Sequence, residues 1–95
     1  MSEQDPTRPP DDLLVAALGA ALFASDEPVP VSELSEAFGG VPPAEIEGAI
    51  DRLREQLDRS SSGLRVEPVA GGFQLSTTPA VGPWVRQFFR QRNRA

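Results

Sequence analysis

The side chains of this chain that could do acid–base or metal chemistry are carboxylates, because the sequence contains no histidine and no cysteine. Histidine is the commonest general base and metal ligand, and a cysteine thiolate is the other common nucleophile. Five carboxylates gather within residues 44–59, at Glu45, Glu47, Asp51, Glu55 and Asp58. Neighbours four residues apart lie on one helix face, where Arg54 and Arg59 can form ordinary surface ion pairs with them. The spacing therefore predicts a solvated helix face and neither an acid pair nor a metal site.

The glycine pair Gly71-Gly72 is the other pattern with possible chemistry. It lies between two alternating segments, so it lacks the strand-to-helix setting of a phosphate-binding loop and predicts a hairpin turn. With no catalytic constellation present, we expect a chain that is not an enzyme and that needs no cofactor and no metal.

Charge is distributed unevenly along the chain. Residues 1–67 hold fourteen acids and five arginines, a net charge of −9, whereas residues 68–95 hold no acid and a net charge of +4. The basic end is usually just solvated, but it could also contact DNA nonspecifically or an acidic partner. The residues concerned are Arg86, Arg90, Arg92 and Arg94.

An uncharged apolar run at residues 13–24 predicts the helix around which the chain is organised, extending over residues 11–25. The run is too short to span a bilayer, which needs about 20 apolar residues, and Asp11 and Asp12 before it exclude a signal peptide. Its bulky side chains share one face and its alanines the other. Two interpretations of the alanine face remain open: burial in a central core helix, or contact with a second copy. The predicted bulky face consists of Leu14, Val15, Leu18, Leu22 and Phe23.

Proline and glycine divide the rest of the chain into short elements. We expect a minimal strand at residues 29–31, helices at 33–38 and 44–59 with Ser32 as the first N-cap, and a hairpin over 64–78. A last helix follows Thr78, with an irregular opening at Pro83. This order predicts a mostly α fold with a small β wing (α+β), the winged helix-turn-helix. The expected core consists of Leu14, Leu18, Leu22, Leu34, Phe38, Ile46, Ile50, Leu53, Leu57, Leu64, Val66, Phe73 and Leu75.

Ninety-five residues are enough for one domain. We expect a disordered leader at residues 1–10, the winged-helix domain at 11–90 and a basic flexible tail at 91–95. No targeting segment is recognisable, so the expected location is the cytoplasm.

Three blocks of sequence resemble ScpB, the segregation and condensation protein B of bacteria. They are AALFASDEPV at residues 20–29 with Leu34 after it, GLRV and VAGGFQLST within 63–77, and PWV at 83–85 leading into the last helix. The resemblance covers residues 12–90. That family is built from two winged-helix domains, and this sequence resembles the first and stops where the second would begin.

The resemblance implies a non-catalytic architectural subunit of the bacterial SMC–kleisin condensin, associated with the nucleoid in chromosome condensation and segregation. In the family the first domain forms the homodimer, whereas the second grips the kleisin ScpA, which bridges the heads of an SMC ATPase. A second copy is therefore the partner implied most directly, and ScpA with its SMC ATPase is implied through the domain that the resemblance does not cover. No membrane partner is implied.

A winged-helix transcriptional regulator that uses the basic tail is the alternative. The charges of the helix-turn-helix oppose it, because residues 44–59 carry five acids against three arginines and the preceding helix adds Glu33 and Glu36. Such a surface repels phosphate, so specific DNA binding is not expected.

The last helix carries more aromatic surface than a small domain can bury. Trp84 is either a core plug or an interface anchor, and Phe88 and Phe89 point about 100° apart, so one of them needs cover from a partner. We expect a two-fold interface between copies. Its candidate residues are Ala16, Ala20, Val81, Trp84, Phe88 and Phe89.

Overall fold

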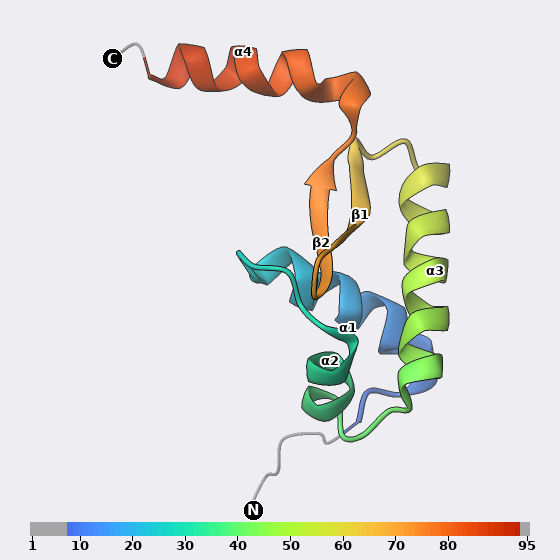
Figure 1. Cartoon of the computed structure of the whole chain (residues 1–95). Helices are drawn as coiled ribbons and strands as arrows, with labels where there is room; N and C mark the ends of the chain where they lie inside the picture. The colour runs from blue at the N-terminus through green and yellow to red at the C-terminus, as the bar shows by residue number, and fades with distance from the viewer. Residues whose placement is uncertain (1–7, 94–95) are drawn as a thin grey trace, which may run out of the picture.

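The computed structural model describes residues 8–93; the first seven residues of the predicted leader and Arg94 of the basic tail lie outside them. Three helices and a hairpin pack into a body, and a last helix projects from the far end of the hairpin (Figure 1). The predicted winged-helix plan is confirmed. The elements are α1 (Asp11–Ala24), α2 (Val31–Ala37), α3 (Pro43–Arg59), β1 (Leu64–Val69), β2 (Gly72–Thr77), the 3-10 turn η1 (Pro79–Val81) and α4 (Gly82–Arg92).

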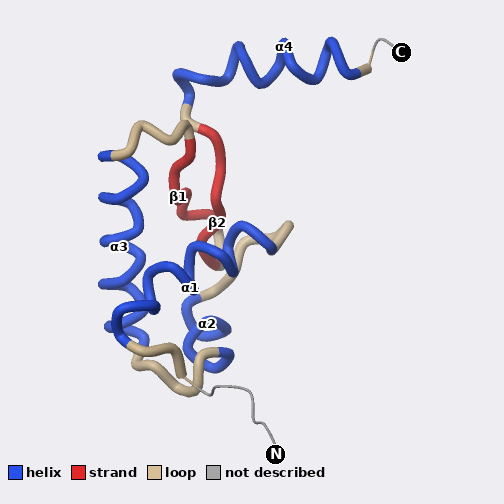
Figure 2. The backbone as a smooth tube through the Cα atoms, turned by 180° about the vertical axis from the view of Figure 1, so that it is seen from behind, coloured by secondary structure: helices blue, strands red, loops and turns tan. Residues whose placement is uncertain are grey.

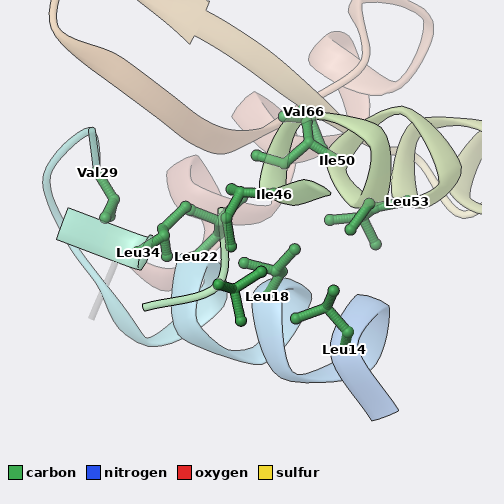
Figure 3. Packing of buried hydrophobic residues seen from close by; sticks show 11 residues of the cluster. Leu14, Leu18, Leu22, Val29, Leu34, Ile46, Ile50, Leu53 and Val66 are labelled. Atoms are coloured by element: carbon green, nitrogen blue, oxygen red, sulfur yellow. The ribbon is translucent and has the colours of Figure 1, made fainter. Parts of the chain in front are cut away.

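The core forms where the inner face of α1 meets α3. Leu14, Leu18 and Leu22 recur every four residues, so they share one face of α1 and point at α3 (Figure 3). Helix α1 lies close to α3 at Gly19, where an added Cβ would be 3.3 Å from a methyl carbon of Leu53. The fully packed residues are Leu14, Leu18, Leu22, Val29, Leu34, Val41, Ile46, Ala49, Ile50, Leu53 and Val66.

The predicted core differs from the observed one at its edges. Leu64 begins β1 at the open end of the hairpin, and its exposed fraction is 37%. Phe38, Leu57, Phe73 and Leu75 pack against the core but remain partly open. The residues that the prediction missed are Val29, Val41 and Ala49, which are short side chains in linkers or between the larger apolar positions of a helix.

The helix α2 starts two residues earlier than predicted, and Ser32 is not its N-cap. Pro30 precedes Val31 with an extended backbone, and its carbonyl accepts hydrogen bonds from the amides of Glu33 and Leu34. The fixed φ of proline suits this position, and no side-chain hydrogen bond caps the helix. The hydroxyl that ties this region together is that of Ser35, which donates to the carbonyl oxygen of Val41 at 2.6 Å.

We expect Ser35→Ala to lower the free energy of unfolding by about 1 kcal/mol, because the partly buried carbonyl of Val41 loses its donor. Ser32→Ala is the matched control: its side chain is exposed on the same helix, so the change should stay within about 0.5 kcal/mol. Urea unfolding followed by circular dichroism measures both. Equal losses in the two variants would contradict the role given to Ser35.

The hairpin is held to the body by a third extended segment. β1 and β2 pair antiparallel with Leu64 opposite Thr77 and Val69 opposite Gly72. Val29 adds a single bridge to Phe73, with amide-to-carbonyl distances of 2.8 and 3.0 Å in the two directions. The predicted strand at residues 29–31 is thus reduced to one residue, because α2 already begins at Val31.

The far end of the hairpin leads directly into α4. The amide of Thr78 donates to the carbonyl of Gly63 at 2.8 Å, and the chain then makes η1 before the regular helix begins at Gly82. The irregular opening was predicted at Pro83, but it lies at Pro79–Val81, and Pro83 is already part of the first turn of the regular helix, where proline is tolerated. α4 packs mainly against η1, and the hairpin separates it from α1 in both views (Figures 1 and 2).

Candidate interaction surfaces

The carboxylates of α3 line its outer side. Glu47, Asp51, Glu55 and Asp58 are exposed, and ion pairs join Arg54 to Asp51 at 3.3 Å and Arg59 to Glu55 at 3.8 Å. These are neighbours three and four residues apart on one helix, as expected for a solvated face. Within residues 8–93 no group of three or more acidic side chains could hold a metal ion.

Glu45 behaves differently, because it reaches back to the segment before α1. The Arg8 guanidinium lies 2.7 Å from Glu45 and 3.2 Å from Asp11. The hydrogen bonds that these carboxylates accept, chiefly that of Glu45, raise the pKa of Arg8. An arginine is charged at any physiological pH, so this contact fixes the chain before α1 without creating an acid or a base.

A shallow hollow of about 370 Å³ lies where the end of α3 meets η1. Leu57, Leu64 and Val81 form its apolar part, and hydroxyls from Ser62 and Thr78 border it. Val81 lies close to Gly63, because a Cβ added at Gly63 would be 3.6 Å from a methyl carbon of Val81. Asp58 also lines the hollow, but within residues 8–93 its carboxylate accepts no hydrogen bond from the hydroxyl of Ser62 or Thr78, so neither hydroxyl is paired with a base.

The helix α4 carries an exposed aromatic face. The exposed fractions are 66% for Trp84, 53% for Phe88 and 52% for Phe89. The two phenylalanine rings meet edge to face with centroids 5.1 Å apart, and Arg92 lies 5.7 Å above the Phe88 ring. Monomeric proteins seldom leave such rings open to water, so this face is a candidate interaction surface.

The helix α1 has a second apolar surface, its outer face, on the side opposite the core leucines. Phe23 is 79% exposed there, so its predicted place on the bulky inner face is wrong. It lies one residue beyond Leu22, about 100° around the helix, where neither α3 nor the hairpin covers it. The outer face consists of Leu13, Ala16, Ala20, Phe23 and Ala24, all of them exposed.

The six predicted interface residues lie in three separate places of one protomer. Ala16 and Ala20 belong to the outer face of α1, Val81 lines the hollow beside η1, and the aromatic residues are on α4. Leu13 and Phe23 were not among these candidates, although they are exposed on the same stripe of α1 as Ala16 and Ala20. The arginines at positions 86, 90 and 92 are exposed on α4.

No helix within residues 8–93 is both long enough and apolar enough to cross a membrane.

The model of one protein family, described as segregation and condensation complex subunit ScpB, matches residues 16–95. The segregation and condensation protein B of Moorella thermoacetica is 34% identical over 79 residues, which are 83% of this chain and 40% of that protein. The homolog of Coxiella burnetii is 30% identical over 76 residues, 77% of this chain and 35% of that protein. The chain therefore spans less than half the length of these relatives.

Solved structures share the fold. A dimer of the ScpB N-terminal domain complexed with ScpA peptide matches with a TM-score of 0.73 and 26% identity, over 81% of this chain and 95% of that one. A conserved hypothetical protein from Chlorobium tepidum gives a TM-score of 0.71 and 31% identity, over 81% and 48%. ScpB from Mycobacterium tuberculosis gives a TM-score of 0.80 at 22% identity, over 99% and 55%.

Proposed function

Because this chain belongs to the family of the segregation and condensation complex subunit ScpB, we propose that it is a non-catalytic dimerisation subunit of an SMC–kleisin condensin. It acts as a homodimer in chromosome condensation and segregation, in the cytoplasm at the nucleoid. The unit that carries this role is the winged-helix domain at residues 11–90.

The observation that supports this proposal best is the aromatic face of α4. Trp84, Phe88 and Phe89 lie on the surface of a helix that packs mainly against the turn η1, and each of the three remains more than half exposed in one protomer. A two-fold axis is the commonest way to cover such a face, because one self-complementary surface then closes the assembly. The solved dimer with ScpA peptide, similar over 81% of this chain, supports the same arrangement.

The same solved complex supports an ScpA segment as the second partner. The sequence resemblance alone placed kleisin binding in the second domain of the family, which this chain does not resemble. The complex holds an ScpA peptide with the N-terminal domain, so the region that this chain matches is sufficient for a contact in that protein. We therefore include ScpA, and through it an SMC ATPase, among the proposed partners.

The surface of the helix-turn-helix disfavours the alternative, a transcriptional regulator. A recognition helix needs basic side chains toward the phosphates, whereas the exposed side of α3 presents Glu47, Asp51 and Glu55. The arginines of α4 are at the opposite end of the hairpin from α2, so the two surfaces do not form one DNA-binding face (Figure 1).

We expect the double variant Phe88→Ser, Phe89→Ser to shift the dimer to monomer while the helical circular-dichroism signal stays intact. Burial of one aromatic ring contributes roughly 1.5–3 kcal/mol, and the two rings of each copy lie outside the core. Light scattering across a concentration series gives the mass. Gln87→Ser, an exposed change on α4 that removes no aromatic ring, is the control and should remain dimeric. A monomer mass for the unmodified protein at high micromolar concentration would contradict the proposed homodimer.

A further inference from the structure

Two apolar helix faces remain open in one protomer. The outer face of α1 runs from Leu13 to Ala24, and the aromatic face of α4 runs from Trp84 to Phe89. At about 1.5 Å per residue the first is about 18 Å long and the second about 9 Å, so the aromatic face fits within the length of the outer face. Leu13 at one end is 53% exposed and Phe23 at the other end is 79% exposed, so bulky side chains border the alanines between them. The short alanine side chains leave room for the aromatic rings of α4 to pack between these bulkier residues.

The α4 of a protomer does not cover its own α1. The hairpin stands between the two helices in views taken from opposite sides, with α4 at one end of it and α1 at the other (Figures 1 and 2). The turn at Pro79–Val81 holds α4 against the far end of the hairpin. A second copy is therefore the partner that can bring an α4 to an α1.

Two copies could pair these faces in three ways: α4 with α4, α1 with α1, or α4 with α1. The charges of the two helices distinguish between them. α4 carries Arg86, Arg90 and Arg92 and no acid. Pairing α4 with α4 would bring the arginines of both copies together, which costs free energy because like charges repel.

The surroundings of α1 have the opposite sign. Asp12 borders the outer face at the start of the helix, and Asp26 and Glu27 follow its end. Among residues 8–93 none of these three forms an ion pair within the protomer. Pairing α1 with α1 would place these acids against each other, whereas pairing α4 with α1 places arginines among carboxylates.

We propose that α4 is an exchanged arm: the α4 of each copy lies along the outer face of α1 of the other copy. This inference rests on the homodimer proposed above and specifies its geometry. The two-fold axis makes both contacts identical, so each protomer gives one arm and receives one. Ala16 and Ala20 then meet Trp84, Phe88 and Phe89 across the interface, although they are far apart in one chain.

The surface available is close to what a stable dimer requires. A complete aromatic side chain has about 150–250 Å² of surface, and four rings per copy are more than half exposed. On that scale the rings leave about 500 Å² open on each copy, or about 1,000 Å² for two. Leu13 and the alanines add to this, and stable interfaces begin at about 1,200 Å² in total.

Cysteine cross-linking tests the geometry directly, because the chain has no cysteine of its own. One population carries Gln91→Cys, at the edge of the aromatic face of α4. A second population carries Ala16→Cys or Ala24→Cys, in the first and the second half of the outer face of α1. The populations are mixed, allowed to exchange subunits, and treated with a short thiol-reactive cross-linker. Glu55→Cys, exposed on α3, replaces the α1 cysteine as the matched control.

The exchanged arm predicts a covalent dimer in the mixture of α4 and α1 variants, and none with the α3 control. The α1 position that reacts faster reports the direction of the arm. Cross-linking of the Gln91→Cys or the Ala16→Cys population with itself, without any product in the mixture, would overturn the exchanged arm but keep the dimer. A monomer mass in light scattering together with no cross-link in any sample would instead overturn the homodimer itself.

Trp84 supplies a second measurement that no cross-linker affects. It is the only tryptophan of the chain, and it is 66% exposed in the protomer. Dilution should shift its emission to longer wavelength as the arm leaves the partner. Ala20→Glu, on the outer face of α1, should move this transition to at least tenfold higher protein concentration, although position 20 and Trp84 are far apart in the protomer. A dilution curve that Ala20→Glu leaves unchanged would contradict the exchanged arm.

Discussion

Replacement of Gly72 by alanine should lower the free energy of unfolding by about 2–5 kcal/mol. An added Cβ would lie 2.4 Å from the carbonyl carbon and oxygen of Val29 and 2.7 Å from the nitrogen of Pro30. These are backbone atoms, so no flexible side chain can move aside. Relief of the clash requires opening the bridge between Val29 and Phe73, whose two hydrogen bonds hold the hairpin to the body.

Gly48→Ala serves as the control for this prediction. Gly48 lies within α3, and the nearest atom to an added Cβ is the end of the Arg52 side chain at 4.0 Å. Alanine is favoured over glycine inside a helix, so this variant should gain about 0.5–1 kcal/mol. Urea unfolding of both variants by circular dichroism gives the comparison. A loss below about 1 kcal/mol for Gly72→Ala would mean that the hairpin does not approach Val29 as closely as described.

Leu18→Ala should cost about 2–5 kcal/mol, because it opens a cavity at the centre of the core. The side chain is fully buried and points from the middle of α1 toward α3, between Leu14 and Leu22 (Figure 3). Helices on both sides are held by other buried residues, so the neighbours cannot fully collapse into the space. For a domain with a total stability of roughly 5–15 kcal/mol, this is a large share.

Leu18→Met is the control, since it keeps the volume and should cost less than about 1.5 kcal/mol. Unfolding is followed by far-ultraviolet circular dichroism at one fixed protein concentration, because the proposed dimerisation would add to the apparent stability. Tryptophan emission is unsuitable, since Trp84 lies on α4, away from the core. Equal losses for the alanine and methionine variants would show that something other than a cavity sets the cost.

Periodicity and punctuation were sufficient to predict the order of the elements and the centre of the core. The four-residue spacing of Leu14, Leu18 and Leu22 predicts a shared face, and the structure buries all three against α3. The spacing does not indicate how much of the circumference of α1 is buried by the elements around it. Phe23 was assigned to the same face as these leucines, but it is 79% exposed. Whether another element packs over a helix residue depends on the tertiary arrangement, which the spacing of residues along one helix does not report.

The sequence indicated that the aromatic residues of the last helix are hard to bury in one protomer, but it did not indicate where they lie relative to α1. Phe88 and Phe89 were expected not to be both buried, whereas Trp84 was left open between the core and an interface; the structure exposes all three. Their distance from Ala16 and Ala20 depends on the direction in which α4 leaves the hairpin. That direction is set by the turn at Pro79–Val81, a few backbone angles that leave no periodic signal in the sequence.

Mutations in α1 should fall into two genetic classes, because its two faces serve different contacts. Changes at Leu18 reduce the amount of folded chain, whereas changes at Ala20 leave a folded chain that does not assemble. With exchanged arms, an allele damaged at Ala20 and an allele damaged at Phe88 carry complementary lesions. A mixed dimer of the two keeps one of its two arm contacts, while neither allele alone keeps any. Two such alleles in one cell would therefore complement each other, and two alleles damaged on the same helix face would not.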